Sequence, residues 1–241
     1  MSFHDFILPV LAFFSEVIGT VSGFGSSTFF IPIAIYFEKF ELVLALTAFL
    51  HCFSNIFKLV LFRNSLSFDL IKKMALPYLI LTFVGSLMAV YFSAEVWSRL
   101  LGFFLVVLSI VFIWKSRFQN KKWPAPVIYS VIGFSGFFTG LIGTGGALRG
   151  LALAFLNLEK STFVAVSAAI DFGGDFVRLL VYLRNQFMDW SQWYYLPLLL
   201  FAGYLGPRVG QMILLRIHQQ QFEKIVAGFV FLNGLLLIFR A

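Results

Sequence analysis

The chain has 241 residues, of which 60% are hydrophobic and 12% are charged, and its formal net charge is +7. Soluble domains contain about 45–50% apolar and about 25% charged residues, so this composition excludes a water-soluble protein and predicts an integral membrane protein. The single cysteine, Cys52, excludes internal disulfides and thiolate metal clusters, and we expect neither a metal nor a cofactor. The basic residues fall mostly in short loops, which positive-inside topology explains better than nucleic-acid binding does.

At about 20 residues per crossing, a chain of this length holds roughly eight to ten membrane segments. In chain order, hydropathy predicts the apolar stretches Phe3–Phe37, Leu42–Phe62, Phe68–Phe92, Val96–Trp114, Val127–Leu156, Phe163–Leu183, Trp190–Leu215 and Phe222–Phe239. The first has no basic n-region and no small-residue cleavage site, so we interpret it as a membrane segment and not as a removed signal peptide. The first and fifth stretches are too long for one upright helix, and a glycine-rich sequence interrupts each of them.

One real linker is predicted, Lys115–Pro126. It holds four basic residues, no acidic residue and two prolines, and the prolines argue against a continuous helix. Basic loops are retained in the cytoplasm, so we place this linker there. It divides the chain into a first transmembrane repeat, residues 1–114, and a second one, residues 127–241.

The two halves resemble each other. "TAFLHCFSNIFKL" (Thr47–Leu59) aligns with "SAAIDFGGDFVRL" (Ser167–Leu179). The alignment pairs polar residues that are rare in membrane helices: His51 with Asp171, Asn55 with Asp175, and Lys58 with Arg178. Duplicated halves with paired broken helices are typical of secondary transporters, and the breaks point to the binding site.

Whether the repeats are inverted depends on how the broken segments cross. A segment that doubles back as a hairpin gives each repeat an odd number of crossings and places Arg216 and Lys224 in the cytoplasm, as the positive-inside rule prefers. A segment that crosses once places them outside. We favour the hairpin. The predicted fold is an all-α integral membrane protein with two homologous, inverted repeats of about four membrane segments, each beginning with a glycine-broken helix.

The glycine-rich stretches "GTVSGFGSSTFFIPI" (Gly19–Ile33) and "GFFTGLIGTGGALRGLAL" (Gly136–Leu153) resemble the paired glycine motifs of the sulfite exporter TauE/SafE family. The resemblance covers nearly the whole chain, including its length, duplication and basic central linker. It implies a transporter of small sulfur-containing anions such as sulfite or organosulfonates, in the cell membrane and most readily a bacterial inner membrane. The sequence departs from the family pattern at Ser26 and Ser27, which follow Gly25, and at Gly150, which stands where the first half has Pro32.

The breaks predict an anion-binding site. An interrupted helix leaves backbone N–H groups unpaired, which is tolerated only toward protein or a watery cavity, and helix N-termini bind anions. Arg149 has Ile31 as its repeat partner, so the fold does not require its charge, and a guanidinium fork suits an oxyanion. The predicted substrate-binding residues are Gly23, Gly25, Ser26, Ser27, Thr28, Gly140, Gly143, Thr144, Gly145, Gly146 and Arg149.

Each element of this site has an alternative interpretation. The glycines could serve only close helix packing, which is how we interpret Gly206 and Gly210. Arg149 could instead reach an interface or pair with an acidic residue.

A second polar set predicts ion coupling. Asp171, Asp175 and Arg178 share one helix face, and His51 and Asn55 occupy the equivalent face in the first half. We expect Asp175 to pair with Arg178, three residues later. Asp171 is too far from Arg178 for a direct bond, so we expect it to lack a partner and to bind and release a proton.

The alternatives to coupling are a structural salt bridge within the helix and, for Lys58, a side chain that snorkels to the membrane surface.

The leading functional hypothesis is a secondary transporter, not an enzyme, with a small anion, the lipid bilayer and coupling protons as its partners. A passive anion channel is one alternative. The other is an intramembrane serine hydrolase, with Ser26 or Ser27 as nucleophile and His51 as base. The duplication argues against the hydrolase because the second half has Asp171 in place of His51 and Gly145 in place of Ser27.

Overall fold

The computed structural model describes residues 3–22, 25–91, 94–118, 123–156, 158–214 and 216, with seven further residues between 228 and 239. Within these ranges the chain forms helices and no strand. The α-helices are α1 (Phe3–Ser22), α2 (Ser27–Ala34), α3 (Phe40–Leu61), α4 (Phe68–Met88), α5 (Ala94–Phe118), α6 (Ala125–Ile142), α7 (Gly146–Ala154), α8 (Lys160–Arg184) and α9 (Tyr195–Leu214). Short 3₁₀ turns are η1 (Arg63–Ser65), η2 (Ala89–Tyr91) and η3 (Trp190–Gln192).

The helices follow the predicted apolar stretches closely. Among the described residues, the segments Phe40–Leu61, Phe68–Tyr91 and Ala125–Ile142 are long and apolar enough to cross a membrane. Helix α5 continues to Phe118, into the stretch expected to be linker. The predicted segment Phe222–Phe239 lies mostly outside the described residues, although Gly234 packs tightly against Gly102 of α5.

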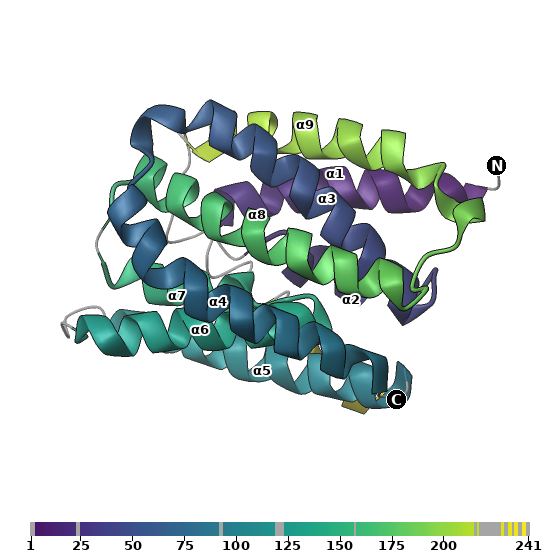
Figure 1. The fold of residues 1–241 in the computed structure, drawn as a ribbon, viewed down its shortest axis with the longest axis horizontal. Helices are drawn as coiled ribbons and strands as arrows, with labels where there is room; N and C mark the ends of the chain where they lie inside the picture. The colour runs from purple at the N-terminus through teal and green to yellow at the C-terminus, as the bar shows by residue number, and fades with distance from the viewer. Residues whose placement is uncertain are drawn as a thin grey trace.

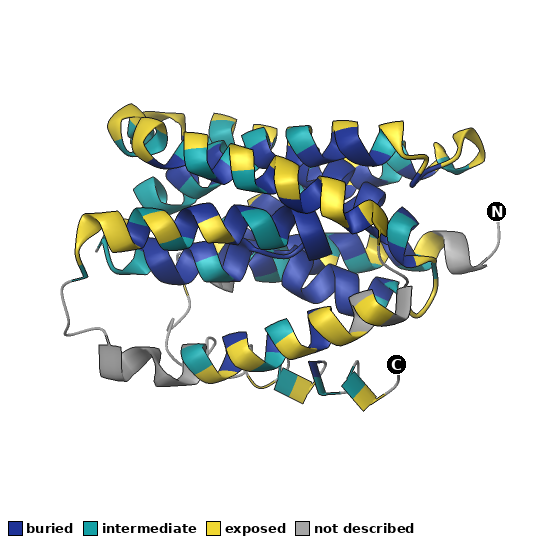
Figure 2. Cartoon of the chain, turned by 60° about the horizontal axis from the view of Figure 1, so that its bottom comes forward, coloured by how far each residue is buried: buried dark blue, intermediate teal, exposed yellow. Residues whose placement is uncertain are grey.

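The distribution of exposed and buried side chains differs from that of a soluble protein. Large apolar side chains such as Phe103, Phe134 and Phe201 are exposed, whereas Glu16 and Arg178 are fully buried. Figure 2 shows exposed residues along the outward helix faces and buried residues inside. Charged residues in membrane proteins face the bundle interior and mark functional paths, so the buried charges locate the candidate site.

The helices pack in matched pairs. Helix α1 packs along α9, α6 packs along α4, and α3 crosses α8 in the middle of the bundle (Figure 1). Glycines permit both outer contacts. A Cβ on Gly206 or Gly210 of α9 would meet Glu16 or Thr20 of α1 at 2.5 and 2.7 Å, which confirms the predicted packing role of these two glycines.

Each half begins with two helices separated by a glycine-containing turn. Gly25 precedes α2 with φ of +82°, and Gly143 follows α6 with φ of +74°. Such left-handed backbone favours glycine. After each turn the chain returns along the helix it has just left: Ser26 contacts Glu16 in α1, and Gly145 lies against Ser135 in α6.

Candidate functional site

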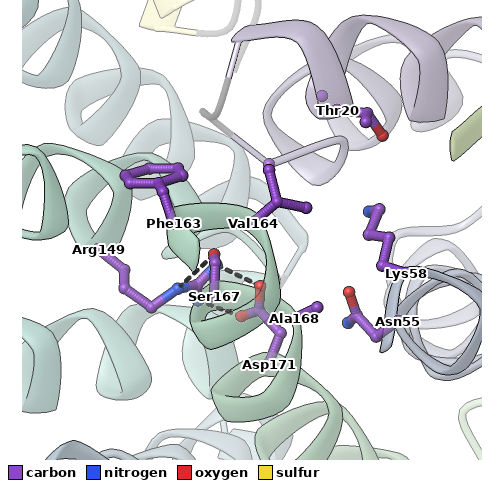
Figure 3. A pocket seen from close by; sticks show the side chains of 11 residues that line it. Thr20, Asn55, Lys58, Arg149, Phe163, Val164, Ser167, Ala168 and Asp171 are labelled. Carbon is purple, nitrogen blue, oxygen red and sulfur yellow. Dashed lines mark hydrogen bonds and ion pairs between the residues drawn. The ribbon is translucent and has the colours of Figure 1, made fainter. Parts of the chain in front are cut away.

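Gly25 of the first break and Arg149 of α7 border a partly open cavity of about 40 Å³. About 10–15 Å³ of such space holds one water molecule, so the cavity has room for roughly three waters or a small anion. Figure 3 shows Arg149, Ser167 and Asp171 on one side and Asn55 and Lys58 on the other. The lining residues are Gly19, Thr20, Gly25, Asn55, Lys58, Arg149, Phe163, Val164, Ser167, Ala168 and Asp171.

Arg149 and Asp171 form a two-pronged ion pair beside the cavity. Arg149 Nη1 and Nη2 donate to the two carboxylate oxygens of Asp171, and Arg149 Nε and Nη2 reach Ser167 Oγ at 3.2 and 3.1 Å. The expectation that Asp171 lacks a partner was therefore wrong. Because α7 packs against α8, Arg149 and Asp171 are in contact although they are 22 positions apart in the sequence.

Asp175 and Arg178 form the predicted pair within α8. Arg178 Nε donates to Asp175 Oδ1 at 2.9 Å, which confirms that expectation, and Asn55 Nδ2 donates to Asp175 Oδ2 at 2.9 Å. The side chain of Asp175 is 1% exposed and that of Arg178 is 0% exposed. A buried pair with its remaining hydrogen-bonding groups satisfied is far less costly than either charge alone, and the bond from Asn55 links this pair to α3.

Glu16 of α1 is a site residue that the sequence reasoning missed. Its Oε2 accepts from Lys58 Nζ at 2.9 Å, and its Oε1 accepts from Ser26 Oγ at 2.5 Å. Ser26 Oγ also lies 2.8 Å from His51 Nε2. Lys58 is paired inside the bundle, so the snorkelling alternative was wrong. The signal was available, because Glu16 is an acidic residue in the interior of the apolar stretch Phe3–Phe37.

The two breaks contact each other. Thr28 Oγ1 and Thr144 Oγ1 are 3.1 Å apart, and a Cβ on Gly25 would lie 3.3 Å from Gly146 Cα. Helix α8 binds carbonyls near the second break: Arg178 Nη1 donates to Gly143 O at 3.4 Å. Backbone groups freed at membrane depth need such partners.

Tyr182 of α8 provides a further partner of this kind, since its hydroxyl donates to Gly140 O at 2.6 Å. Gly140 also packs against Thr82 at the crossing of α4 and α6, together with Gly136, which packs against Tyr78. Part of the glycine-rich stretch therefore serves helix packing.

The predicted site residues divide into two groups by position. Gly25, Arg149, Asn55 and Asp171 line the cavity. Ser26, Ser27, Thr28 and Thr144 are buried without lining it, and Gly23 lies outside the described residues. In the described part of the chain, no group of three or more His, Cys, Asp or Glu side chains could hold a metal ion.

Comparison with known proteins gives one match. The family model described as sulfite exporter TauE/SafE matches residues 8–237. No curated protein and no solved structure matches the chain.

Proposed function

Because this chain belongs to the sulfite exporter TauE/SafE family, we propose that it is a secondary transporter that moves small sulfur-containing anions, of the sulfite or organosulfonate type, across the cytoplasmic membrane. The family match supports the anion class, and the buried charges and lipid-like exterior support a multi-pass protein of the inner membrane. The further details of the mechanism rest on the geometry of the cavity.

The observation that carries the proposal is a cavity lined by the cations Arg149 and Lys58 and by the Ser167 hydroxyl. The Arg149 guanidinium is held by Asp171, which also lines the cavity, so an anion binds this guanidinium by taking the place of the Asp171 carboxylate. Guanidinium groups bind the oxygens of planar and tetrahedral oxyanions with two parallel hydrogen bonds. The backbone at Gly25 lies open to the same space. We propose that the anion binds here, beside Gly25 of the first break and Arg149 of α7.

The packing supports inverted repeats. Exchanging α1 with α6, α3 with α8 and α4 with α9 converts each matched contact into another: α1 with α9 becomes α6 with α4. His51 contacts Arg178 and Asn55 contacts Asp175, so a later residue of α3 contacts an earlier residue of α8. The two helices therefore run in opposite directions, as Figure 1 also shows. The hairpins at Ser26 and Gly145 give each repeat the odd number of crossings that inversion requires.

The charge balance supports proton coupling. Three buried acid–base pairs surround the site: Lys58 with Glu16, Arg149 with Asp171, and Arg178 with Asp175. With His51 neutral, the cluster has no net charge. A monoanion such as an organosulfonate that enters a buried neutral cluster leaves one uncompensated charge at low dielectric, and a proton taken up at the same time removes it. We propose Asp171, with His51, Asn55, Asp175 and Arg178 around it, as part of this coupling apparatus.

One observation favours the hydrolase alternative, namely the 2.8 Å separation between Ser26 Oγ and His51 Nε2. A catalytic His needs a carboxylate on its other nitrogen and a free lone pair toward the serine. Here Arg178 Nη2 lies 3.3 Å from Nδ1, and the nearest Asp175 oxygen is 3.7 Å away. A guanidinium only donates, so Nδ1 accepts, and the ring proton is on Nε2, facing Ser26. This arrangement favours a role for Ser26 in passing protons over a role as a catalytic nucleophile.

Uptake into reconstituted vesicles tests the proposal. The panel is sulfite, thiosulfate, a taurine-like sulfonate, sulfate and a carboxylate, each with and without an imposed proton gradient. We expect uptake of sulfur anions that a proton gradient drives above equilibrium. Gradient-independent flux would favour the channel, and failure to move any sulfur anion would reject the proposal. Labelling of Ser26 by a fluorophosphonate would favour the hydrolase.

A further inference from the structure

Glu16 is a fully buried carboxylate that the binding site proposed above does not use. Among the described residues, α3, the turn before α2 and α9 contact it. Helix α3 presents Lys58 at 2.9 Å and His51, whose Nε2 lies 3.8 Å from Oε1. The turn before α2 presents the Ser26 hydroxyl, and α9 packs Gly206 against the Glu16 Cβ. Lys58 and His51 are therefore the ionisable groups that face this carboxylate.

The hydrogen bonds from His51 to Glu16 run in one direction. Arg178 Nη2 occupies Nδ1 of His51, so neutral His51 carries its proton on Nε2 and donates it to Ser26 Oγ. Ser26 in turn donates its hydroxyl proton to Glu16 Oε1 at 2.5 Å. A hydroxyl that accepts from one titratable group while donating to another is arranged to pass protons between them.

We propose that Glu16 is a binding site for the coupling proton, that Ser26 transfers this proton between His51 and Glu16, and that protonation of Glu16 releases Lys58 to bind the anion. This inference rests on the transport function proposed above. It assigns the proton to the first half of the chain, whereas Arg149 and Asp171 belong to the second half.

A proton from solvent first converts His51, whose side chain is 11% exposed, to imidazolium with protons on both ring nitrogens. The Nε2 proton moves to Ser26 Oγ while the Ser26 hydroxyl proton moves to Glu16 Oε1. Imidazolium becomes neutral imidazole with its proton on Nδ1, and the carboxylate becomes a neutral acid. The Nδ1 proton then faces the Asp175 carboxylate, 3.7 Å away, and no longer accommodates the Arg178 donor.

The consequence for the anion follows from the position of Lys58. Its ammonium group is held by Glu16 Oε2 and, at 3.5 Å, by Ser54 Oγ, and the side chain lines the cavity (Figure 3). When Glu16 is neutral, the Lys58 charge no longer has a counter-ion. An anion in the cavity supplies one, so proton and anion binding favour each other.

Infrared difference spectroscopy on the purified protein without any anion, between about pH 5 and pH 8, tests the proton site. In the Asp171→Asn background, which removes the second proposed proton site, we expect a protonated carboxyl band at the acid end and its loss when Glu16→Gln is added. A band that survives in the Asp171→Asn, Glu16→Gln double variant overturns the inference. This readout needs no transported anion. If the Glu16 band is present but the vesicles take up no sulfur anion, the proton site at Glu16 is retained and only the transport function is rejected.

Stopped-flow proton uptake tests the transfer step. Ser26→Ala keeps the Lys58–Glu16 pair but removes the hydroxyl, and we expect uptake to slow by roughly tenfold or more. Ser109→Ala is the matched control, because Ser109 is fully buried and bonds only the carbonyl of Leu105 in its own helix. Equal rates for Ser26→Ala and the wild type would overturn the relay.

Binding of thiosulfate tests the role of Lys58, because the charge of thiosulfate does not change over this pH range. At the alkaline end we expect Glu16→Gln to bind it roughly tenfold more tightly than the wild type does. Adding Lys58→Met should abolish that gain while also removing the unpaired charge that could impair folding. A gain that persists without Lys58 would contradict the proposal.

Discussion

Asn55 and Asp175, which align as partners in the two halves of the sequence, are hydrogen-bonded to each other over 2.9 Å. Two equivalent residues can touch only where they lie close to the axis that relates the halves. The two breaks also contact each other, through Thr28 and Thr144, although these are not equivalent positions. The proposed duplication therefore has its axis near the middle of α3 and α8, where Asn55 and the buried Asp175–Arg178 pair lie.

The proposed inversion predicts the membrane topology. The basic linker should be cytoplasmic and the N-terminus should lie outside. Cys52 is the only cysteine and is buried, so replacing it with alanine gives a clean background for labelling. A cysteine at Ser2 should react with an impermeant maleimide in intact cells, and one at Asn120 should react only after permeabilisation. Labelling of both cysteines only after permeabilisation would indicate one crossing per broken segment.

Most of the fold was readable from the sequence because membrane helices need long apolar stretches. The boundaries of α3, α4 and α8 lie within a few residues of the predicted ones. The pair Asp175–Arg178 was also readable, because residues three apart on a helix are neighbours. These inferences use local spacing, which the sequence contains directly.

The partners of Arg149 and Glu16 were not readable in this way. Arg149 reaches Asp171, and Glu16 reaches Lys58, only because the chain reverses at each break. Sequence separation says nothing about which residues a hairpin brings together. The different roles of the glycines could not be predicted for the same reason. Gly140 is a packing residue because it lies where α4 and α6 cross, whereas Gly25 lines the cavity.

Gly140→Ala should destabilise the protein. A Cβ at this position would overlap the Thr82 carbonyl and would push α4 and α6 apart, and overpacking of this kind costs roughly 1–3 kcal/mol. Gly133→Ala in the same helix is the matched control. Its Cβ would meet the Pro77 side chain at 3.3 Å, and alanine favours the helix by about 1 kcal/mol. Thermal unfolding in detergent should separate the two variants, and equal unfolding temperatures would show that this crossing adjusts without strain.

Arg149→Ala should weaken anion binding. Loss of a charge-assisted hydrogen bond is worth roughly 1.5–3 kcal/mol, or about ten- to a hundredfold in affinity. Arg149→Lys should restore binding only in part, because an ammonium group cannot reproduce the two-pronged contact. Thiosulfate binding by calorimetry measures both effects.

A folding control is needed for this variant because Arg149→Ala leaves Asp171 without its ion-pair partner. Arg149→Ala combined with Asp171→Asn removes both charges and should recover thermal stability without recovering anion binding. If Arg149→Ala alone binds thiosulfate as the wild type does, the arginine is structural and the anion rests on backbone and hydroxyl donors.

Asp171 and Asp175 should respond differently to neutralisation, because their surroundings differ although each pairs with an arginine. The side chain of Asp171 is 18% exposed and lines the cavity, whereas that of Asp175 is 1% exposed. After Asp171→Asn, Arg149 keeps its hydrogen bonds to Ser167 and still faces the cavity. After Asp175→Asn, Arg178 remains as a buried cation beside His51, and breaking a buried pair costs roughly 3–5 kcal/mol.

We therefore expect Asp175→Asn to lower yield and thermal stability, and Asp171→Asn to fold, bind the anion and show a flatter pH dependence of uptake. The flattening follows because the neutral amide leaves Arg149 available to the anion at every pH, as a protonated Asp171 would. Vesicle uptake of thiosulfate between about pH 5 and pH 8, with both variants normalised to the amount of folded protein, measures the difference. An Asp171→Asn protein that retains the wild-type pH profile would remove this residue from the coupling apparatus, and the proton site proposed at Glu16 would then stand without it.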